Sequence, residues 1–158
     1  MDVLIVLFTV FIVGIVISKL TQKDFKWRFN GNLAICCMLC FTGIGHFLFT
    51  KGMAMMLPGV IPYRESLVYI TGIAEIIFGI LLLFPAYRKT TGVIIILFFV
   101  LVLPANIYSV LHNVNLKEAN YTGNGVGYLW FRVPLQVFLI GWVYIFSVRE
   151  KKNNKLLF

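Results

Sequence analysis

Charge is scarce in this sequence, and acidic charge most of all. Of the 158 residues 13% are charged, with 14 Lys and Arg against six Asp and Glu, whereas 60% are hydrophobic. So little polar sequence excludes a sizeable water-soluble domain, and the mean hydropathy of +0.92 is typical of a multi-pass membrane protein. The net charge of +8 does not indicate a nucleic-acid partner, because the basic residues lie between apolar runs, where orientation in a lipid bilayer explains them.

Metal-ligating and redox-active residues are equally few. The chain has two His and three Cys, and no spacing in it matches a metal site, a haem-ligand pair or a flavin motif, so we expect no metal and no intrinsic cofactor. Cys36, Cys37 and Cys40 lie in one apolar run, which excludes an extracellular disulfide framework. Cys37 and Cys40 form a Cys-x-x-Cys, but apolar surroundings keep a thiol protonated and unreactive. The sequence leaves the role of the three thiols open.

What the chain does contain is a series of five apolar segments of about membrane length. Asp2 stands where a signal peptide would have a basic residue, and no small-x-small cleavage site follows, so the first segment is expected to be a retained helix. The pattern predicts an all-α membrane protein with three parts: an N-terminal transmembrane helix over 1–18, a four-helix membrane domain over 32–148 and a basic cytoplasmic tail over 149–158. The five predicted spans are 3–18, 33–49, 67–84, 92–111 and 128–148.

The distribution of Lys and Arg predicts the orientation of these spans. Ten of them fall on one side of a five-span topology and four on the other. Because cytoplasmic loops carry the excess of Lys and Arg, the N-terminus is expected outside and the C-terminus in the cytoplasm of a cell (inner) membrane. The ten are Lys19, Lys23, Lys26, Arg28, Arg88, Lys89, Arg149, Lys151, Lys152 and Lys155; the four are Lys51, Arg64, Lys117 and Arg132.

The span over 67–84 contains a single carboxylate, Glu75, near its middle. An ionisable group at that depth costs at least about 2.5–3.5 kcal/mol, so its side chain needs a partner or a wet cavity. Thr71, Gly72 and Gly79 share its helix face, and small residues let a neighbouring helix approach closely. We therefore expect Glu75 to point into the bundle.

Polar residues on three other spans reach the same depth. His46 lies near the far end of the second span, and Asn106 follows Pro104, which frees a backbone carbonyl one turn earlier and bends its helix. Arg132 and Gln136 recur at one-turn spacing in the last span. With about 1.5 Å of rise per residue, all of them fall in the outer half of the bilayer. The candidate ligand-binding residues are His46, Glu75, Asn106, Tyr108, Arg132 and Gln136.

We expect Glu75 and Arg132 to form a buried ion pair, with the other candidates satisfying the remaining donors and acceptors. The ionised pair would grip a polar ligand head, whereas a neutral Glu75 would move a proton. Alternatively, one polar residue per helix specifies helix pairing without any ligand. No residue is assigned a catalytic role.

Two segments between the spans carry further motifs. Residues 50–65 are rich in Met and interrupted by Pro58 and Pro62, which predicts a segment at the membrane interface or partly inside the mouth of the bundle. The loop over 112–127 contains a Gly-x-Gly-x-Gly, but no strand precedes it, so a flexible loop is expected rather than a nucleotide site.

Several motifs, taken in this order, resemble the DoxX-like family of small bacterial membrane proteins over about 32–146. That family is a four-helix membrane bundle, so the resemblance implies that the first span is an addition. Its namesakes are associated with thiosulfate:quinone oxidoreductase, and other relatives with membrane redox or thiol-stress complexes. A more distant likeness is to a eukaryotic membrane chaperone for neurotransmitter receptors. The motifs are Gly43-Ile44-Gly45-His46-Phe47, Pro58 and Pro62, Gly72-Ile73-Ala74-Glu75 with Gly79, and Pro104-Ala105-Asn106-Ile107-Tyr108.

These patterns favour a redox-associated membrane subunit that binds a quinone-like or other amphipathic ligand, since apolar walls with a few convergent polar groups suit such a ligand. His46 and Glu75 would handle protons, Arg132 would fix a polar head, and Asn106 and Gln136 would orient it. If the protein takes part in a reaction, it would be an accessory subunit of a membrane oxidoreductase with a membrane or soluble redox partner. A non-catalytic assembly factor or chaperone remains an alternative. So does a small transporter, for which five spans without a repeat would require an oligomer.

Overall fold

The computed structural model describes residues 2–21, 27–123 and 125–149, and these form an all-helical structure without strands. Most of the basic tail predicted over 149–158 lies outside the described residues. An isolated bridge joins Asn115 and Asn120 in the loop that follows α5. The elements are α1 (Asp2–Thr21), α2 (Trp27–Leu48), the short α3 (Thr50–Ala54), α4 (Arg64–Leu81), α5 (Arg88–Leu111), the 3₁₀ turn η1 (Val126–Tyr128), α6 (Leu129–Val143) and the π-helical turn η2 (Tyr144–Val148).

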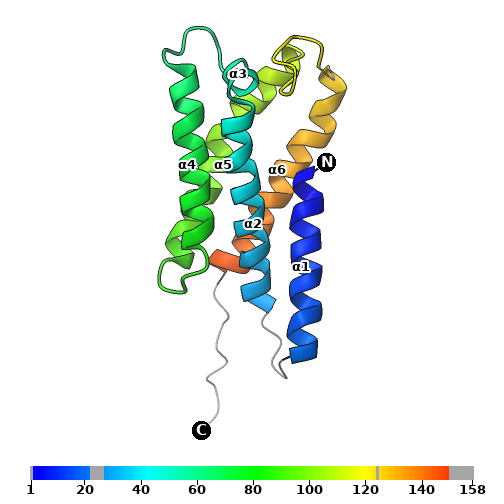
Figure 1. The fold of residues 1–158 in the computed structure, drawn as a ribbon, viewed down its shortest axis with the longest axis vertical. Helices are drawn as coiled ribbons and strands as arrows, with labels where there is room; N and C mark the ends of the chain where they lie inside the picture. Colours follow the sequence, from blue (N-terminus) through cyan, green and yellow to red (C-terminus); the bar gives the residue numbers. More distant parts are fainter. Residues whose placement is uncertain (1, 22–26, 124, 150–158) are drawn as a thin grey trace.

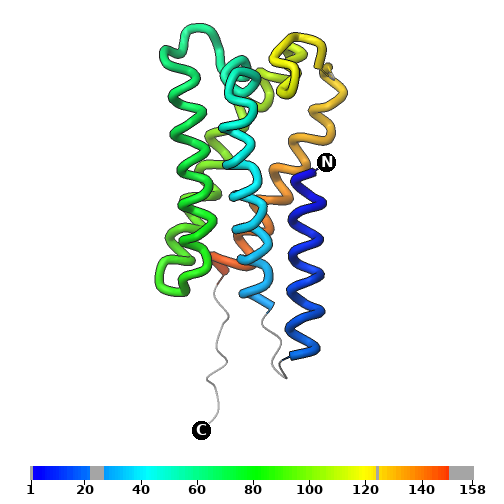
Figure 2. The backbone as a smooth tube through the Cα atoms, viewed as in Figure 1, coloured from blue at the N-terminus to red at the C-terminus, as the bar shows by residue number. Residues whose placement is uncertain are grey.

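The five long helices lie side by side and alternate in direction along the chain (Figure 1). Helices α2, α4, α5 and α6 form a four-helix bundle, in which α2 packs most extensively on α4, and α5 on α6 with η2. The additional helix α1 packs against α2 and is displaced toward one end of the bundle (Figures 1 and 2). We call that end, where α1 and α4 finish and α2 and α5 start, the basic end. The opposite end, covered by α3, is the α3 end.

Four helical segments are long and apolar enough to cross a membrane, with bounds 2–21, 27–48, 88–111 and 126–148. They coincide with four of the five predicted spans. The remaining one corresponds to α4, whose 18 residues include Arg64, Glu65 and Glu75. Helix α4 runs beside α2 over most of its length (Figure 1).

The hydrophobic core occupies the half of the bundle toward the basic end. Leu7 and Phe11 of α1 pack there with Ile35, Trp142 and Phe146. Gly31 makes this packing close, because a Cβ atom at its position would lie 2.1 Å from the Phe146 ring. The apolar core is therefore densest in this half of the bundle.

The first turns of α2 are part of this packing, although the sequence indicates a polar connection there. Asn32 is fully buried, and its side-chain nitrogen donates to the carbonyl of Phe146 at 3.0 Å, while the Ser147 hydroxyl donates to the Asn32 side-chain oxygen at 2.6 Å. Arg28 donates to the carbonyls of Phe146 at 3.2 Å and Arg149 at 2.7 Å. These groups satisfy the carbonyls where η2 ends, which a helix leaves without intrahelical donors.

Candidate functional site

The first polar cluster lies between α2 and α4, where two glycines bring the helices together. A Cβ at Gly72 would lie 2.7 Å from the Cβ of His46, and one at Gly43 would lie 2.8 Å from the carbonyl oxygen of Gly72. Val68, Gly72, Glu75 and Gly79 form the buried face of α4. This confirms the expected small-residue stripe and the inward direction of Glu75, which is 7% exposed.

Two side chains of α2 contact the Glu75 carboxylate. The Thr42 hydroxyl donates to Oε2 at 2.6 Å, and Nε2 of His46 lies 3.5 Å from Oε1. On the other side of the imidazole ring, Nδ1 lies 2.9 Å from the carbonyl oxygen of Val68 and 3.1 Å from the Thr71 hydroxyl. His46 and Glu75 form the one ion pair found among the described residues.

This geometry limits the positions that hydrogen atoms can take between His46 and Glu75. A carbonyl oxygen only accepts, so His46 Nδ1 carries a hydrogen and donates it to Val68. The contact between Nε2 and Oε1 then needs a second hydrogen, because two lone pairs would otherwise face each other. That hydrogen belongs either to an imidazolium beside a carboxylate or to a carboxylic acid beside a neutral imidazole. Both forms have zero net charge, which lowers the cost of burial.

The second polar cluster joins α5 and α6. Nη1 of Arg132 donates to the side-chain oxygen of Asn106 at 2.6 Å and lies 3.4 Å from the Ser109 hydroxyl. The Asn106 amide nitrogen donates to the Gln136 side-chain oxygen at 2.9 Å. The Arg132 guanidinium also lies 5.6 Å from the centre of the Tyr128 ring. The helix register predicted for Arg132 and Gln136 is thus confirmed.

The prolines of α5 and α6 explain part of this arrangement. Pro104 has no N–H, so the carbonyl of Val100 loses its helical donor. The Gln136 amide donates to the adjacent carbonyl, that of Phe99, which is a side-chain bond across the helix pair at the disturbed turn. Pro134 stands inside α6 as Pro104 does inside α5, each two residues before the amide side chain that bridges the helices.

The predicted ion pair between Glu75 and Arg132 is wrong. Glu75 bonds across α2 and α4, whereas Arg132 bonds across α5 and α6. In the bundle α4 packs against α2, α3 and α5 but not against α6, so the two residues lie on diagonally opposed helices. The five groups share a half of the bundle, as predicted, but they form two separate clusters.

The sixth candidate, Tyr108, belongs to neither cluster. Its ring stacks on His112 at the end of α5, with ring centres 3.9 Å apart. The cysteines also stay apart from both clusters: Cys36 is buried, Cys37 and Cys40 are half-buried, and all three thiols are free. Among the described residues no group of three His, Cys, Asp or Glu side chains could hold a metal ion.

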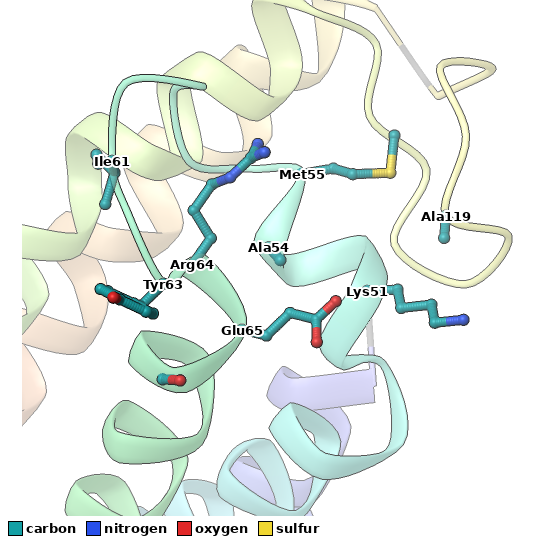
Figure 3. Close-up of a pocket in the computed structure, with 9 residues that line it drawn as sticks. Lys51, Ala54, Met55, Ile61, Tyr63, Arg64, Glu65 and Ala119 are labelled. Carbon is teal, nitrogen blue, oxygen red and sulfur yellow. The ribbon is translucent and has the colours of Figure 1, made fainter.

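A cavity of about 650 Å³ opens at the α3 end (Figure 3). None of the six candidate residues lines it. Its walls come from α3, the turn before α4, the first turn of α4 and the loop after α5, and they combine charged with apolar side chains (Figure 3). The segment over 50–65 was predicted to lie at the membrane interface or partly inside the mouth of the bundle, and no site was predicted in it. The lining residues are Lys51, Ala54, Met55, Ile61, Tyr63, Arg64, Glu65, Ser66 and Ala119.

The fold and its two clusters define an all-helical bundle of the membrane-protein type, in which both clusters lie toward the α3 end. The chain belongs to the family described as domain of unknown function DUF8561, whose family model matches residues 35–147. The match begins in α2 and ends in η2, so it includes both clusters and leaves α1 outside. No curated protein and no solved structure matches the chain.

Proposed function

We propose that the chain is a multi-pass protein of the cell (inner) membrane, crossed by α1, α2, α4, α5 and α6, with the N-terminus outside. The support is twofold. Helix α4 pairs its central charge with α2 instead of exposing it to lipid. The described cations Lys19, Arg28, Arg88 and Lys89 gather at the basic end, which would then face the cytoplasm.

Within this placement the protein serves as a redox-associated membrane subunit that binds a quinone-like or other amphipathic ligand. The observation that carries the proposal is the buried contact between Nε2 of His46 and Oε1 of Glu75, two groups that can hold and exchange a proton. A quinone takes up protons when it is reduced and releases them when it is oxidised, so a buried proton-exchanging pair suits such a ligand. The electrons would come from a partner protein. The DoxX-like motifs support the redox association.

A non-catalytic assembly factor is the second candidate, and a specific observation favours it. Each cluster makes its side-chain hydrogen bonds within one helix pair, and among the described residues no fully buried side-chain nitrogen or oxygen lacks a partner. Clusters of this kind stabilise helix pairing without any ligand. The protein would then act through its surfaces on another membrane protein.

Mass spectrometry of the small molecules that co-purify in mild detergent tests the first function against the second. Wild type would be compared with E75Q, which removes the carboxylate at nearly constant volume. A quinone enriched in wild type and lost in E75Q would support the redox role. Bulk lipid alone in both, together with one stoichiometric partner protein, would contradict it and favour the assembly factor.

A further inference from the structure

Among the acidic residues that the structure describes, none balances the charge of Arg132. Among the four that the structure describes, Glu75 is paired with His46, and Glu118 accepts from Asn120 and Thr122 in the loop after α5. None of the four lies within 4.0 Å of a nitrogen of Arg132. The side chains that Arg132 contacts through hydrogen bonds, those of Asn106 and Ser109, are neutral, and the Tyr128 ring lies beside the guanidinium.

The guanidinium is directed toward α5, not outward along α6. A basic side chain near the end of a membrane helix commonly extends to the aqueous interface. Arg132 instead reaches Asn106 and the buried Ser109 on the neighbouring helix. Both contacts use Nη1, so Nε and Nη2 have no acceptor among the described residues. The side chain is half-buried, which leaves these donors accessible from outside.

We propose that Arg132 binds an oxyanion, a phosphate group held between its free guanidinium donors and the polar edge of the α5–α6 pair. A guanidinium presents parallel N–H donors that match phosphate oxygens, and its preference for such partners rises away from water. Asn106 and Gln136 hold the arginine in position through the chain of bonds from Nη1 to the Phe99 carbonyl. The inference rests on the membrane placement proposed above. The phosphate comes either from the headgroup of an anionic lipid or from free phosphate.

Lipid retention tests the proposal. The protein would be reconstituted in phosphatidylcholine vesicles doped with phosphatidylglycerol and re-extracted in a neutral detergent. The phosphatidylglycerol retained per protein would then be measured by mass spectrometry. Loss of a charged hydrogen bond predicts a decrease of about tenfold in R132Q. The control K117Q removes the same charge from the α3 end but outside the cluster, and it should retain as much lipid as wild type.

A second variant separates ligand binding from a purely structural role. N106D places a carboxylate where the Asn106 side-chain oxygen now accepts from Arg132. It supplies an internal counter-ion, so lipid retention should fall as in R132Q. Because aspartate loses the amide that donates to Gln136, the thermal stability in detergent is measured as well, to show that the variant folds. Because N106D retains the arginine, it remains informative if R132Q does not fold. If wild type retains phosphatidylglycerol selectively and N106D retains as much, the proposal is overturned.

The source of the phosphate is distinguished by adding inorganic phosphate to the detergent-solubilised protein. If phosphate raises the melting temperature of wild type but not of N106D, and phosphatidylglycerol is not retained, the ligand is a free anion. Selective lipid retention without a phosphate effect identifies a headgroup. If neither depends on Arg132, the proposal is wrong. Because quinones are neutral and their test uses E75Q, this failure is distinguishable from failure of the proposed redox function.

Discussion

Nε2 of His46 lies 3.5 Å from Oε1 of Glu75, while Nδ1 of the same ring is directed to the carbonyl of Val68. The carbonyl orients the imidazole, and the carboxylate shares its remaining proton. Thr42 donates to the other carboxylate oxygen at 2.6 Å. A site built in this way holds no net charge while it keeps this proton, and giving the proton to a ligand leaves one negative charge on the pair.

The two side chains should therefore be energetically coupled. In a double-mutant cycle of H46Q, E75Q and the double variant, we expect a coupling free energy of about 0.5–3 kcal/mol in the free energy of unfolding. The cycle can be measured by denaturation in mixed micelles of mild detergent and dodecyl sulfate. The pair T9S and E75Q is the control, because Thr9 lies exposed on α1. Additive effects of H46Q and E75Q would show that the two residues do not share a proton.

Close approach of α2 and α4 gives a second prediction. G72A would place a methyl group 2.7 Å from the Cβ of His46, so one helix must shift and the imidazole must move from Glu75. Overpacking of this kind costs about 1–3 kcal/mol, which we expect as a lowered free energy of unfolding. G141A is the matched control: it lies within α6, and its Cβ would have no other atom within 4 Å. Equal stability of G72A and wild type would contradict the helix contact.

The depth of the polar residues could be predicted from the sequence, whereas their pairing could not. The depth of a residue in the bilayer follows from the helix rise, and the helix face on which it lies follows from the helical period. For these reasons Glu75 and Gln136 were expected to point into the bundle. Which helices are neighbours depends on the packing of whole faces. The Gly43 and Gly72 contact brings α2 against α4 and leaves Arg132 on the diagonal helix. Pairing by charge alone therefore predicted Arg132 as the partner of Glu75, whereas the partner is His46.

The second span was predicted to begin at 33, whereas α2 begins at Trp27, for a related reason. Asn30 and Asn32 stand close to Arg28, and these polar residues lower the hydropathy of the first turns of α2. In the structure their amides satisfy backbone and hydroxyl groups of neighbouring helices, so they are buried. Hydropathy scores a side chain without its partners, and two partners of Asn32, the Phe146 carbonyl and the Ser147 hydroxyl, are more than a hundred residues away in the chain.

The bridge between α5 and α6 supplies a third prediction. Q136L removes the acceptor of the Asn106 amide and the donor to the Phe99 carbonyl while it keeps the volume of the side chain. In membrane proteins a bond of this kind contributes up to about 1–2 kcal/mol, so we expect Q136L to lose this much free energy of unfolding. V137L, on the exposed neighbouring residue, should have no effect. If both variants unfold alike, the bridge does not hold the helix pair.

The last prediction concerns Arg28, which the sequence identifies only as one of the cations that orient the chain. Its guanidinium donates to the carbonyls of Phe146 and Arg149 and lies 3.5 Å from that of Ser147. R28Q should therefore lower the melting temperature in detergent, with a loss of about 1.5–3 kcal/mol in the free energy of unfolding, because hydrogen bonds from a charged donor are lost.

K19Q removes the same charge from the same end, but Lys19 is exposed near the end of α1. Both variants should weaken the orientation signal equally, which reporter fusions at the C-terminus would measure, whereas R28Q alone should destabilise the fold. If K19Q lowers the melting temperature as much, the effect of Arg28 is one of charge and not of its bonds to the end of η2.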